Sequence, residues 1–414
     1  MTTVTPWIGP FTRDYVEEVC DCLDRSLTPQ AHLLVDPFIA AVTADRATIQ
    51  AFGNGGSSSI AQTMSWAIRE ILGPFLHRTR FVGAWDLYHL MEEVERGGFE
   101  ESAVRLLKRD GAAEPDLIVL ISGSGNSRNL VAVARHCLAQ GVPVVSLTGR
   151  SGGAIGELGV PGLRIDSDDQ QIIEDCALAG IYILLSVVAS ILSSGNHGDL
   201  AVAESRDAVH SALRQDSTWV DRVSSALARA ATQQRRVNII APEGGALGLS
   251  AEHIAHNLSW DLRHGIPGVC LSVRSGVSLA DYTGMVNDSG MPGMAASCLL
   301  DDSGPDDVTV IFAHNADHPA VALVRERARA ADLPVHGWYG AVGQPTKNEH
   351  VTIVDTDGLL RVIGAQVTGH VLLRAARAKV PRYFGDLIDE ESRARVPVAP
   401  QACYGKNAAG YPKA

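Results

Sequence analysis

The stretch "DLIVLISGSGNSRNLVAVARHCLAQGVPVVSLTG" at residues 116–149 contains an apolar run, a polar turn, an amphipathic run and a second apolar run. The apolar runs predict buried strands, and the amphipathic run between them predicts a helix. The same order recurs where "TIQAFGNGG" leads into "SSSIAQTMSWAIREIL". Strands that alternate with helices in this way indicate an α/β protein with a mainly parallel sheet.

Glycine- and serine-rich turns stand where these strands end and the helices begin. Open α/β sheets bind ligands at such ends, because the N-termini of the following helices offer free N–H groups to anions. Hydroxyl groups and backbone N–H groups can together hold a phosphate dianion without a large positive charge. The same residue types also suit an ordinary tight turn with a helix N-cap, which is the structural alternative.

Composition limits the classes of function. The chain has 414 residues, which favours two domains, and its net charge of −12 argues against a nucleic-acid or anionic-membrane partner. No signal peptide is evident, and the longest apolar stretch, residues 179–192, is shorter than the roughly 18 residues of a membrane span. The seven scattered cysteines give no disulfide framework. We therefore expect a cytoplasmic protein.

The chain contains an internal repeat. Residues 116–149 align with "DVTVIFAHNADHPAVALVRERARAADLPVHGWYG" at residues 307–340, and we expect Ser124 to correspond to His314. Further along, Tyr182 pairs with His370. The sequence thus predicts two tandem, doubly wound, three-layer αβα domains with mainly parallel sheets. We expect them at residues 1–196 and 197–385, followed by a weakly structured tail at residues 386–414.

Four motifs of the first copy carry a family resemblance. "FGNGGSSSIAQ", "ISGSGNSRNL", "SLTGRSGG" and "DSDDQQIIED" together resemble the sugar isomerase (SIS) family, and most closely the phosphoheptose isomerases, which act on sedoheptulose 7-phosphate. The resemblance covers about residues 30–195, and more faintly 235–380. It implies tandem SIS-type domains and a phosphate held by the polar turns. The phosphate-binding residues would be Asn54, Ser57, Ser122, Ser124, Asn126 and Ser127.

The catalytic positions of the first copy depart from the family. The resemblance implies a histidine and, four residues later, a base glutamate on the helix after the glycine turn, where this chain has Thr63 and Ala67. Tyr182 stands where the family has its catalytic histidine, and Arg96 replaces an aspartate. The first copy alone therefore keeps the phosphate-binding groups and lacks the groups that move protons.

The second copy shows the reverse pattern. Its turn "FAHNADHP" lacks the serines, and the acidic Asp317 there would repel a phosphate. The resemblance places His253 at the family's metal-type histidine, Asn257 at the glutamate, and His370 at the catalytic histidine. Asp288, in "MVNDSGM", restores the aspartate.

The chemistry of these side chains leaves several roles open. Ketose–aldose isomerisation passes through an enediol and needs a base near neutral pKa and an acid, tasks that histidine and carboxylate suit. His253 and His256 stand three residues apart on a predicted helix, with Glu252 beside them, and could bind zinc, transfer protons or line a polar interface. His370 lies on an otherwise apolar helix, and Asp288 in a loop where Asp is a common turn residue.

These observations lead to one hypothesis and two alternatives. We expect a ketose–aldose isomerase of a seven-carbon sugar phosphate, in which the halves form a pseudo-dimer: the first copy's serines anchor the phosphate, while His370, His253 and Asp288 face the carbonyl. The alternatives are a non-catalytic sugar-phosphate-binding or scaffold protein, and an isomerase of an amino-sugar or longer-chain sugar phosphate in specialised metabolism. Zinc is a possible cofactor, and a dimer of tandem chains the expected assembly.

Overall fold

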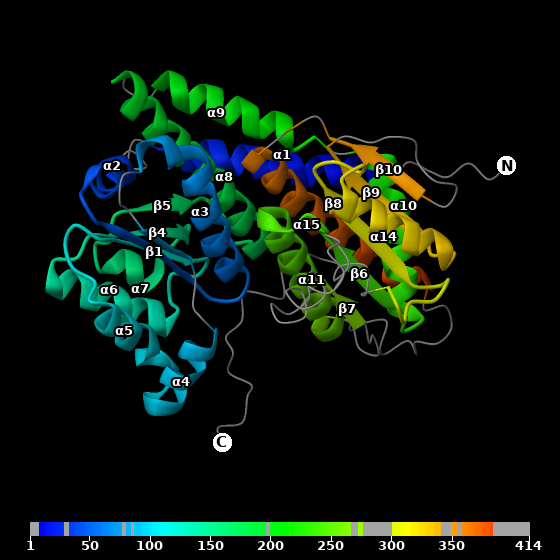
Figure 1. Cartoon of the computed structure of the whole chain (residues 1–414), viewed down its shortest axis with the longest axis horizontal. Coiled ribbons are helices and arrows are strands. Elements are labelled where there is room, and N and C mark those ends of the chain that lie inside the picture. The colour runs from blue at the N-terminus through cyan, green and yellow to red at the C-terminus, as the bar shows by residue number, and fades with distance from the viewer. Residues whose placement is uncertain are drawn as a thin grey trace. The chain divides into compact units, whose positions relative to one another are not determined.

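The computed structural model describes residues 8–28, 33–76, 80–83, 87–195, 199–214, 216–265, 272–275, 300–340, 349–354, 356 and 358–383. They form two compact units, coloured from blue to green and from green to red in Figure 1. The first unit comprises residues 18–211, and the second comprises residues from 212 onward together with those before 18. This division extends the first unit to residue 211 and assigns residues before 18 to the second, whereas the sequence predicted a first domain at 1–196. The predicted tail at 386–414 lies outside the described residues.

The first unit is built on a five-stranded sheet in the order β2-β1-β3-β4-β5, with every pair of neighbours parallel. Helices α2, α3 and α8 cover one face, while α5, α6 and α7 cover the other (Figure 1). The strands are β1 (Thr48–Gly53), β2 (Arg80–Gly83), β3 (Leu117–Ser122), β4 (Val144–Gly149) and β5 (Gly162–Ile165). The helices are α1 (Ile8–Ser26), α2 (Val35–Thr43), α3 (Gly56–Leu72), α4 (Leu87–Gly97), α5 (Phe99–Asp110), α6 (Arg128–Gln140), α7 (Gly153–Glu157), α8 (Gln170–Ser194) and α9 (Asp199–Ala212), with a 3-10 turn at Gly73–Phe75.

The residue types of the central strands explain this arrangement. Every residue of β3 and β4 is buried, as expected for a parallel sheet covered on both faces. The apolar side of α6, including Leu130 and Val133, packs against Ile118 and Leu120 of β3. Helix α8 alone among the described helices is long and apolar enough to cross a membrane, but 61 % of its most apolar window is buried, as in the core helix of a soluble protein.

The second unit repeats the design with the strand order β10-β9-β8-β6-β7, again fully parallel. Helices α10, α11 and α15 pack together, and α14 packs on β8. The prediction of two tandem αβα domains with parallel sheets is therefore confirmed. The elements are β6 (Arg236–Ile240), β7 (Ser272–Arg274), β8 (Val308–Ala313), β9 (Val335–Tyr339), β10 (Glu349–Ile353), α10 (Ser217–Thr232), α11 (Gly245–Gly265), α14 (Pro319–Ala330) and α15 (Gly358–Tyr383).

The equivalence of the two central turns differs by one residue from the predicted alignment. Strands β3 and β8 have the same length, and the helices after them begin at the N-caps Ser127 and His318. Counting from the strand ends and from these N-caps, Ser124 corresponds to Asn315. The expected pairing of Ser124 with His314 was therefore wrong. The conclusion drawn from it stands, because all three serines are still replaced. Ser122, Ser124 and Ser127 correspond to Ala313, Asn315 and His318.

Candidate active site

The serine turn, residues 122–127, joins β3 to α6 and is held by its own hydroxyl groups. Ser122 Oγ lies 3.1 Å from Ser127 Oγ and accepts the backbone N–H of Gly125 at 3.2 Å. Ser124 Oγ accepts the N–H of Asn126 at 3.1 Å. Gly125 has φ of +65°, and a Cβ there would lie 2.1 Å from the carbonyl oxygen of Gly152, so only glycine fits. The turn is thus closely packed with Ser124 on its exposed side.

The glycine turn before α3 lies beside the serine turn, because β1 and β3 are neighbours in the sheet. Asn54 and Asn129 exchange two side-chain hydrogen bonds, of 2.9 and 3.0 Å, which tie the two turns together. Ser57 is buried in the first turn of α3. Asn126 Oδ1 accepts the N–H of Ala154 and so joins the serine turn to α7. All six predicted phosphate-binding residues therefore lie at the carboxyl ends of β1 and β3, where anions bind in open α/β sheets.

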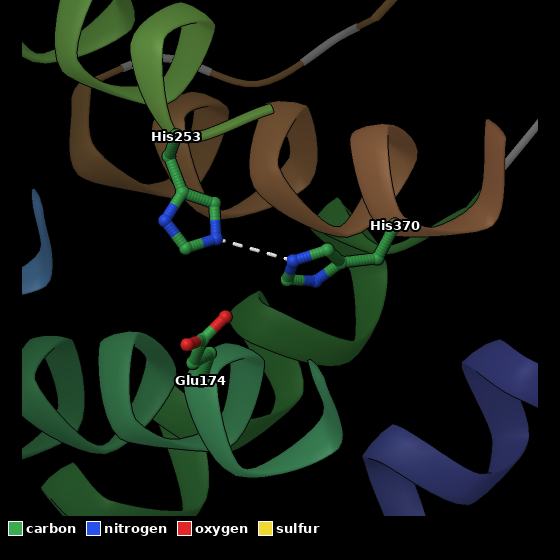
Figure 2. A group of neighbouring side chains, drawn as sticks. All are labelled: Glu174, His253 and His370. Atoms are coloured by element: carbon green, nitrogen blue, oxygen red, sulfur yellow. Dashed lines mark hydrogen bonds between the residues drawn. The ribbon is translucent and has the colours of Figure 1, made fainter. Parts of the chain in front are cut away.

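The second unit contains a buried cluster of two imidazoles and an amide. His253 on α11 and His370 on α15 face each other with Nε2 atoms 3.1 Å apart (Figure 2). The rings meet edge to face, with centroids 5.2 Å apart. Asn257 Nδ2 lies 3.1 Å from His253 Nε2 and 3.0 Å from His370 Nε2. Two imidazole nitrogens on one tetrahedral zinc would be separated by about 3.3 Å, so this pair has the spacing of two zinc ligands.

The other predicted catalytic residues are not part of this cluster. Glu252 and His256 lie on the exposed side of α11, and the His256 ring stacks on Trp260. Partial burial raises the pKa of Glu252 above its usual value. His253 thus lies against His370, which the hypothesis had grouped with it, and not against His256, which the helical spacing had added. Asp288 lies outside the described residues.

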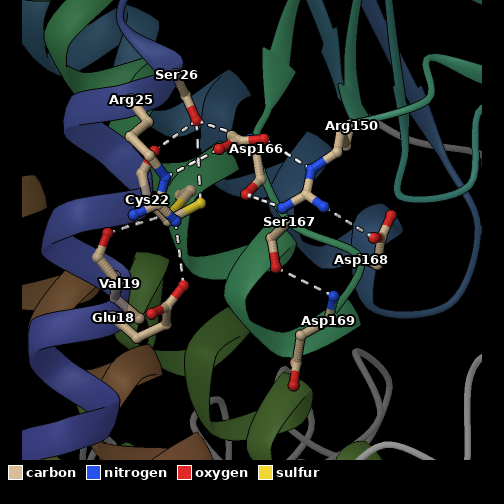
Figure 3. Close-up of polar contacts among 11 residues, drawn as sticks. Glu18, Val19, Cys22, Arg25, Ser26, Arg150, Asp166, Ser167, Asp168 and Asp169 are labelled. Carbon is tan, nitrogen blue, oxygen red and sulfur yellow. Dashed lines mark hydrogen bonds and ion pairs between the residues drawn. The ribbon is translucent and has the colours of Figure 1, made fainter.

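A network of charged side chains lies at the carboxyl end of β4 in the first unit (Figure 3), where the backbone N–H of Gly149 donates to the carbonyl oxygen of Gly123 in the serine turn. Arg150, the residue after β4, donates from Nε to Asp166 Oδ1 at 2.7 Å and contacts Asp168 at 3.3 Å. Asp166 Oδ2 accepts from Nε of Arg25 at 2.9 Å. The hydrogen bonds from Arg25 and Arg150 lower the pKa of Asp166, so its carboxylate stays charged at neutral pH. The network connects α1, the end of β4 and the loop that leads into α8.

Gln170, the first residue of α8, contacts the serine turn and was missed by the sequence analysis. Its Oε1 lies 2.2 Å from the position that a Cβ on Gly123 would take, so the amide packs directly against this glycine. Gln170 Nε2 donates to Glu174 Oε1, one helical turn later, at 2.9 Å. Asp169 starts the helix by accepting two backbone N–H groups. The glycine at position 123 could have indicated a close neighbour, but no nearby sequence pattern pointed to Gln170 as that neighbour.

Comparison with known proteins agrees with this architecture. Two SIS domain models match residues 14–149 and 108–192. The chain is 30 % identical over 166 residues to the phosphoheptose isomerase of Mycobacterium bovis (strain BCG / Pasteur 1173P2), an alignment that covers 39 % of this chain and 82 % of the relative.

Solved structures extend the likeness of fold across both units. One is the C-terminal domain of glucosamine-fructose-6-phosphate aminotransferase from Francisella tularensis, with a TM-score of 0.57 at 13 % identity, covering 90 % of this chain and 97 % of that one. Another is tagatose-6-phosphate ketose/aldose isomerase from Escherichia coli, with a TM-score of 0.53 at 13 % identity and coverage of 91 % and 95 %. The fold, the serine turn and the sequence identity lead to one conclusion: the chain belongs to the SIS domain family.

Proposed function

We propose that the protein is a phosphosugar isomerase that interconverts a ketose phosphate and an aldose phosphate, with a seven-carbon sugar of the sedoheptulose 7-phosphate type as its substrate. The observation that carries the proposal is that one chain combines an intact serine turn with a buried imidazole pair. The identity to a phosphoheptose isomerase supports the same class of substrate.

In this proposal the serine turn and its neighbour before α3 anchor the phosphate. The hydroxyl groups of Ser124 and Ser127 and the free N–H groups at the start of α6 are donors that match the acceptor oxygens of a dianion. Asn54 is already bonded to Asn129, so its part is to hold the two turns at a fixed spacing.

The imidazole pair is proposed to move the proton. In a neutral Nε2···Nε2 contact one ring donates to the lone pair of the other, so the donating ring keeps a basic lone pair on its Nδ1. That nitrogen can take a proton from the carbon beside the carbonyl and return it to the neighbouring carbon of the enediol. The carboxylate base of the family is absent at this position, where Asn257 stands, so histidine would have to serve as the base.

The same pair is also the candidate zinc site, since its nitrogen spacing fits two ligands of one ion. A bound zinc would polarise the carbonyl oxygen. Metal analysis of protein purified without chelators tests this. Zinc near one equivalent in the wild type and a loss in both His253→Ala and His370→Ala would support the site, while equal zinc in all three would refute it.

One experiment tests the isomerase proposal directly. The purified protein is incubated with sedoheptulose 7-phosphate in deuterated water, and the product is examined by NMR for an aldose with deuterium at C2. His370→Ala should abolish both product and exchange, whereas His256→Ala, on the exposed side of α11, should retain them. A panel of six- to eight-carbon ketose phosphates and amino-sugar phosphates defines the substrate.

The alternative functions correspond to distinct outcomes. Binding of a sugar phosphate without turnover or exchange on the whole panel would replace the isomerase with a non-catalytic binding protein, which the lost glutamate favours. Turnover only of an amino-sugar or longer-chain phosphate would change the substrate. A cytoplasmic location and a dimer of tandem chains remain proposals, and sedimentation velocity tests the second.

A further inference from the structure

A second cluster of charged side chains lies at the carboxyl ends of the second unit's strands. Glu243 follows β6, His314 follows β8, and Arg361 extends from α15. The Glu243 carboxylate accepts the backbone N–H of His314. The Nη1 of Arg361 donates to the ring Nδ1 of His314 at 2.9 Å and to its carbonyl oxygen at 3.3 Å. His314 is therefore held between a carboxylate and a guanidinium.

The guanidinium also borders a third strand. A Cβ on Gly340, the residue after β9, would lie 2.1 Å from Arg361 Cζ, so the guanidinium fills the space that a side chain would need. Arg361 is only 9 % exposed. The cluster thus joins the ends of β6, β8 and β9, which are neighbours in the sheet. This is the position at which open parallel sheets hold their ligands.

The ring of His314 accepts a hydrogen bond from Arg361 and carries no positive charge that would repel the guanidinium. Burial lowers the pKa of His314, the Arg361 charge lowers it further, and the Glu243 charge opposes both. The imidazole is therefore neutral near pH 7, and Nδ1 accepts the proton of Arg361 while Nε2 carries the ring's own proton. The cluster therefore carries one positive charge, on Arg361, and one negative charge, on Glu243.

The His314 N–H, which Glu243 accepts, and the Arg361 guanidinium, which contacts the same histidine, are donors of the kind that anion sites use. A backbone N–H directly after a strand and a guanidinium bind phosphate oxygens in the same way that they bind a carboxylate. In the first unit the residue at this place in the glycine turn is the neutral Asn54, and its amide is bonded to Asn129. The second unit thus has a carboxylate of its own chain where the first has a neutral amide.

We propose that Glu243 is a built-in anionic ligand that closes a second phosphate site in the second unit. The wild-type chain then binds one phosphate group per chain, and removal of the Glu243 carboxylate opens a second site served by Arg361 and the His314 N–H. Asp317 in the same turn lies 3.8 Å from Arg325 Nη1, and this ion pair offsets the repulsion that its charge would exert on a phosphate. The stoichiometry of one phosphate group per chain rests on the proposed function, which assigns the first phosphate site to the serine turn. The second site itself does not depend on that assignment.

The test measures binding of inorganic phosphate to the full chain by isothermal titration calorimetry. The parent carries Ser124→Ala and Ser127→Ala, which remove the first site. Adding Glu243→Ala should tighten phosphate binding at least about tenfold, the size of one or two charge-assisted hydrogen bonds. Adding Arg361→Gln to that variant should cancel the gain. Glu252→Ala, which removes an exposed carboxylate from α11 of the same unit, is the matched control and should give no gain.

Each outcome decides the proposal. No gain with Glu243→Ala, or a gain that survives Arg361→Gln, overturns it. Glu243→Asn, which installs the residue that the first unit has in its glycine turn, gives a second reading in case the alanine variant unfolds, and circular dichroism verifies folding. If the parent still binds phosphate as the wild type does, the serine turn is not the first site. The difference in phosphate affinity between the parent and the Glu243 variants still tests the second site.

Discussion

His253 and His370 come from different helices of the second unit, and their Nε2 atoms lie 3.1 Å apart, with the Asn257 amide within 3.1 Å of each. Neither ring can rotate without altering its contact with the other. The pair therefore acts as one group, whether it transfers a proton or ligates a metal.

This coupling makes a prediction for the isomerase reaction. His370→Ala and His253→Ala should each lower kcat by about 100-fold or more with little change in KM, because each removes proton transfer and leaves phosphate anchoring intact. The double variant should be scarcely worse than either single one, since the two rings form one unit. His256→Ala is the control. Fully additive losses would contradict a shared role.

A second prediction concerns the serine turn. Ser124→Ala removes an exposed hydroxyl that accepts the Asn126 N–H, and it should raise KM by about tenfold with kcat nearly unchanged, since phosphate binding contributes to ground and transition states alike. Ser193→Ala, which removes an exposed hydroxyl at the end of α8, should change neither constant. Steady-state kinetics on both variants decides this, and an unchanged KM for Ser124→Ala would remove that hydroxyl from the phosphate site.

Much of the fold could be predicted because it depends on local patterns. The buried run of β3, the polar turn after it and the amphipathic α6 follow one another within one short stretch, and the repeat doubles that information. The expected pairing of Ser124 with His314 was one residue off, because residues 116–149 and 307–340 have equal lengths and their ungapped alignment already places Ser124 on Asn315. The strand ends and helix N-caps of the structure confirm that equivalence.

The candidate site could be predicted in part from continuous motifs and in part from the family resemblance. The serine turn is continuous in the sequence, so its members could be named together. His253 and His370, from helices far apart in the chain, were grouped only through the resemblance, whereas spacing on α11 added His256, which lies on the exposed side of that helix. The contact of Gln170 with Gly123 likewise depends on the loop before α8, whose position follows from the sheet order.

Gln170 provides a third prediction, because its amide packs on the serine turn. Gln170→Ala should raise KM several-fold through loss of support for the turn, and Gln170→Glu should raise it further, since a carboxylate would then face the bound phosphate. The matched control is Gln140→Ala, at the exposed end of α6. Raising the ionic strength should reduce the extra loss in Gln170→Glu but not the loss in Gln170→Ala. If both variants raised KM equally at all salt concentrations, repulsion between the introduced carboxylate and the phosphate would be excluded.

His336 on β9 supplies the last prediction, on stability. Burial lowers its pKa to about 3, helped by the charges of His350, Arg222 and Arg229. In the unfolded chain the ring has its ordinary pKa of about 6.5, so below that pH the unfolded state binds a proton that the folded state does not. The free energy of unfolding should therefore fall by about 1.4 kcal/mol per pH unit from about pH 6.5 towards pH 3 on account of this residue.

Replacement of His336 isolates that contribution. His336→Phe keeps an aromatic ring and removes the titrating group. Between pH 6.5 and 4 its unfolding free energy should therefore fall less steeply with pH than that of the wild type. The difference in slope should approach that of one bound proton, about 1.4 kcal/mol per pH unit. Urea unfolding at several pH values measures the difference in slope. His256→Gln, which removes an exposed histidine, should leave the wild-type slope unchanged. Parallel slopes for His336→Phe and the wild type would mean that His336 is protonated in the folded protein, and that its environment on β9 accepts the charge.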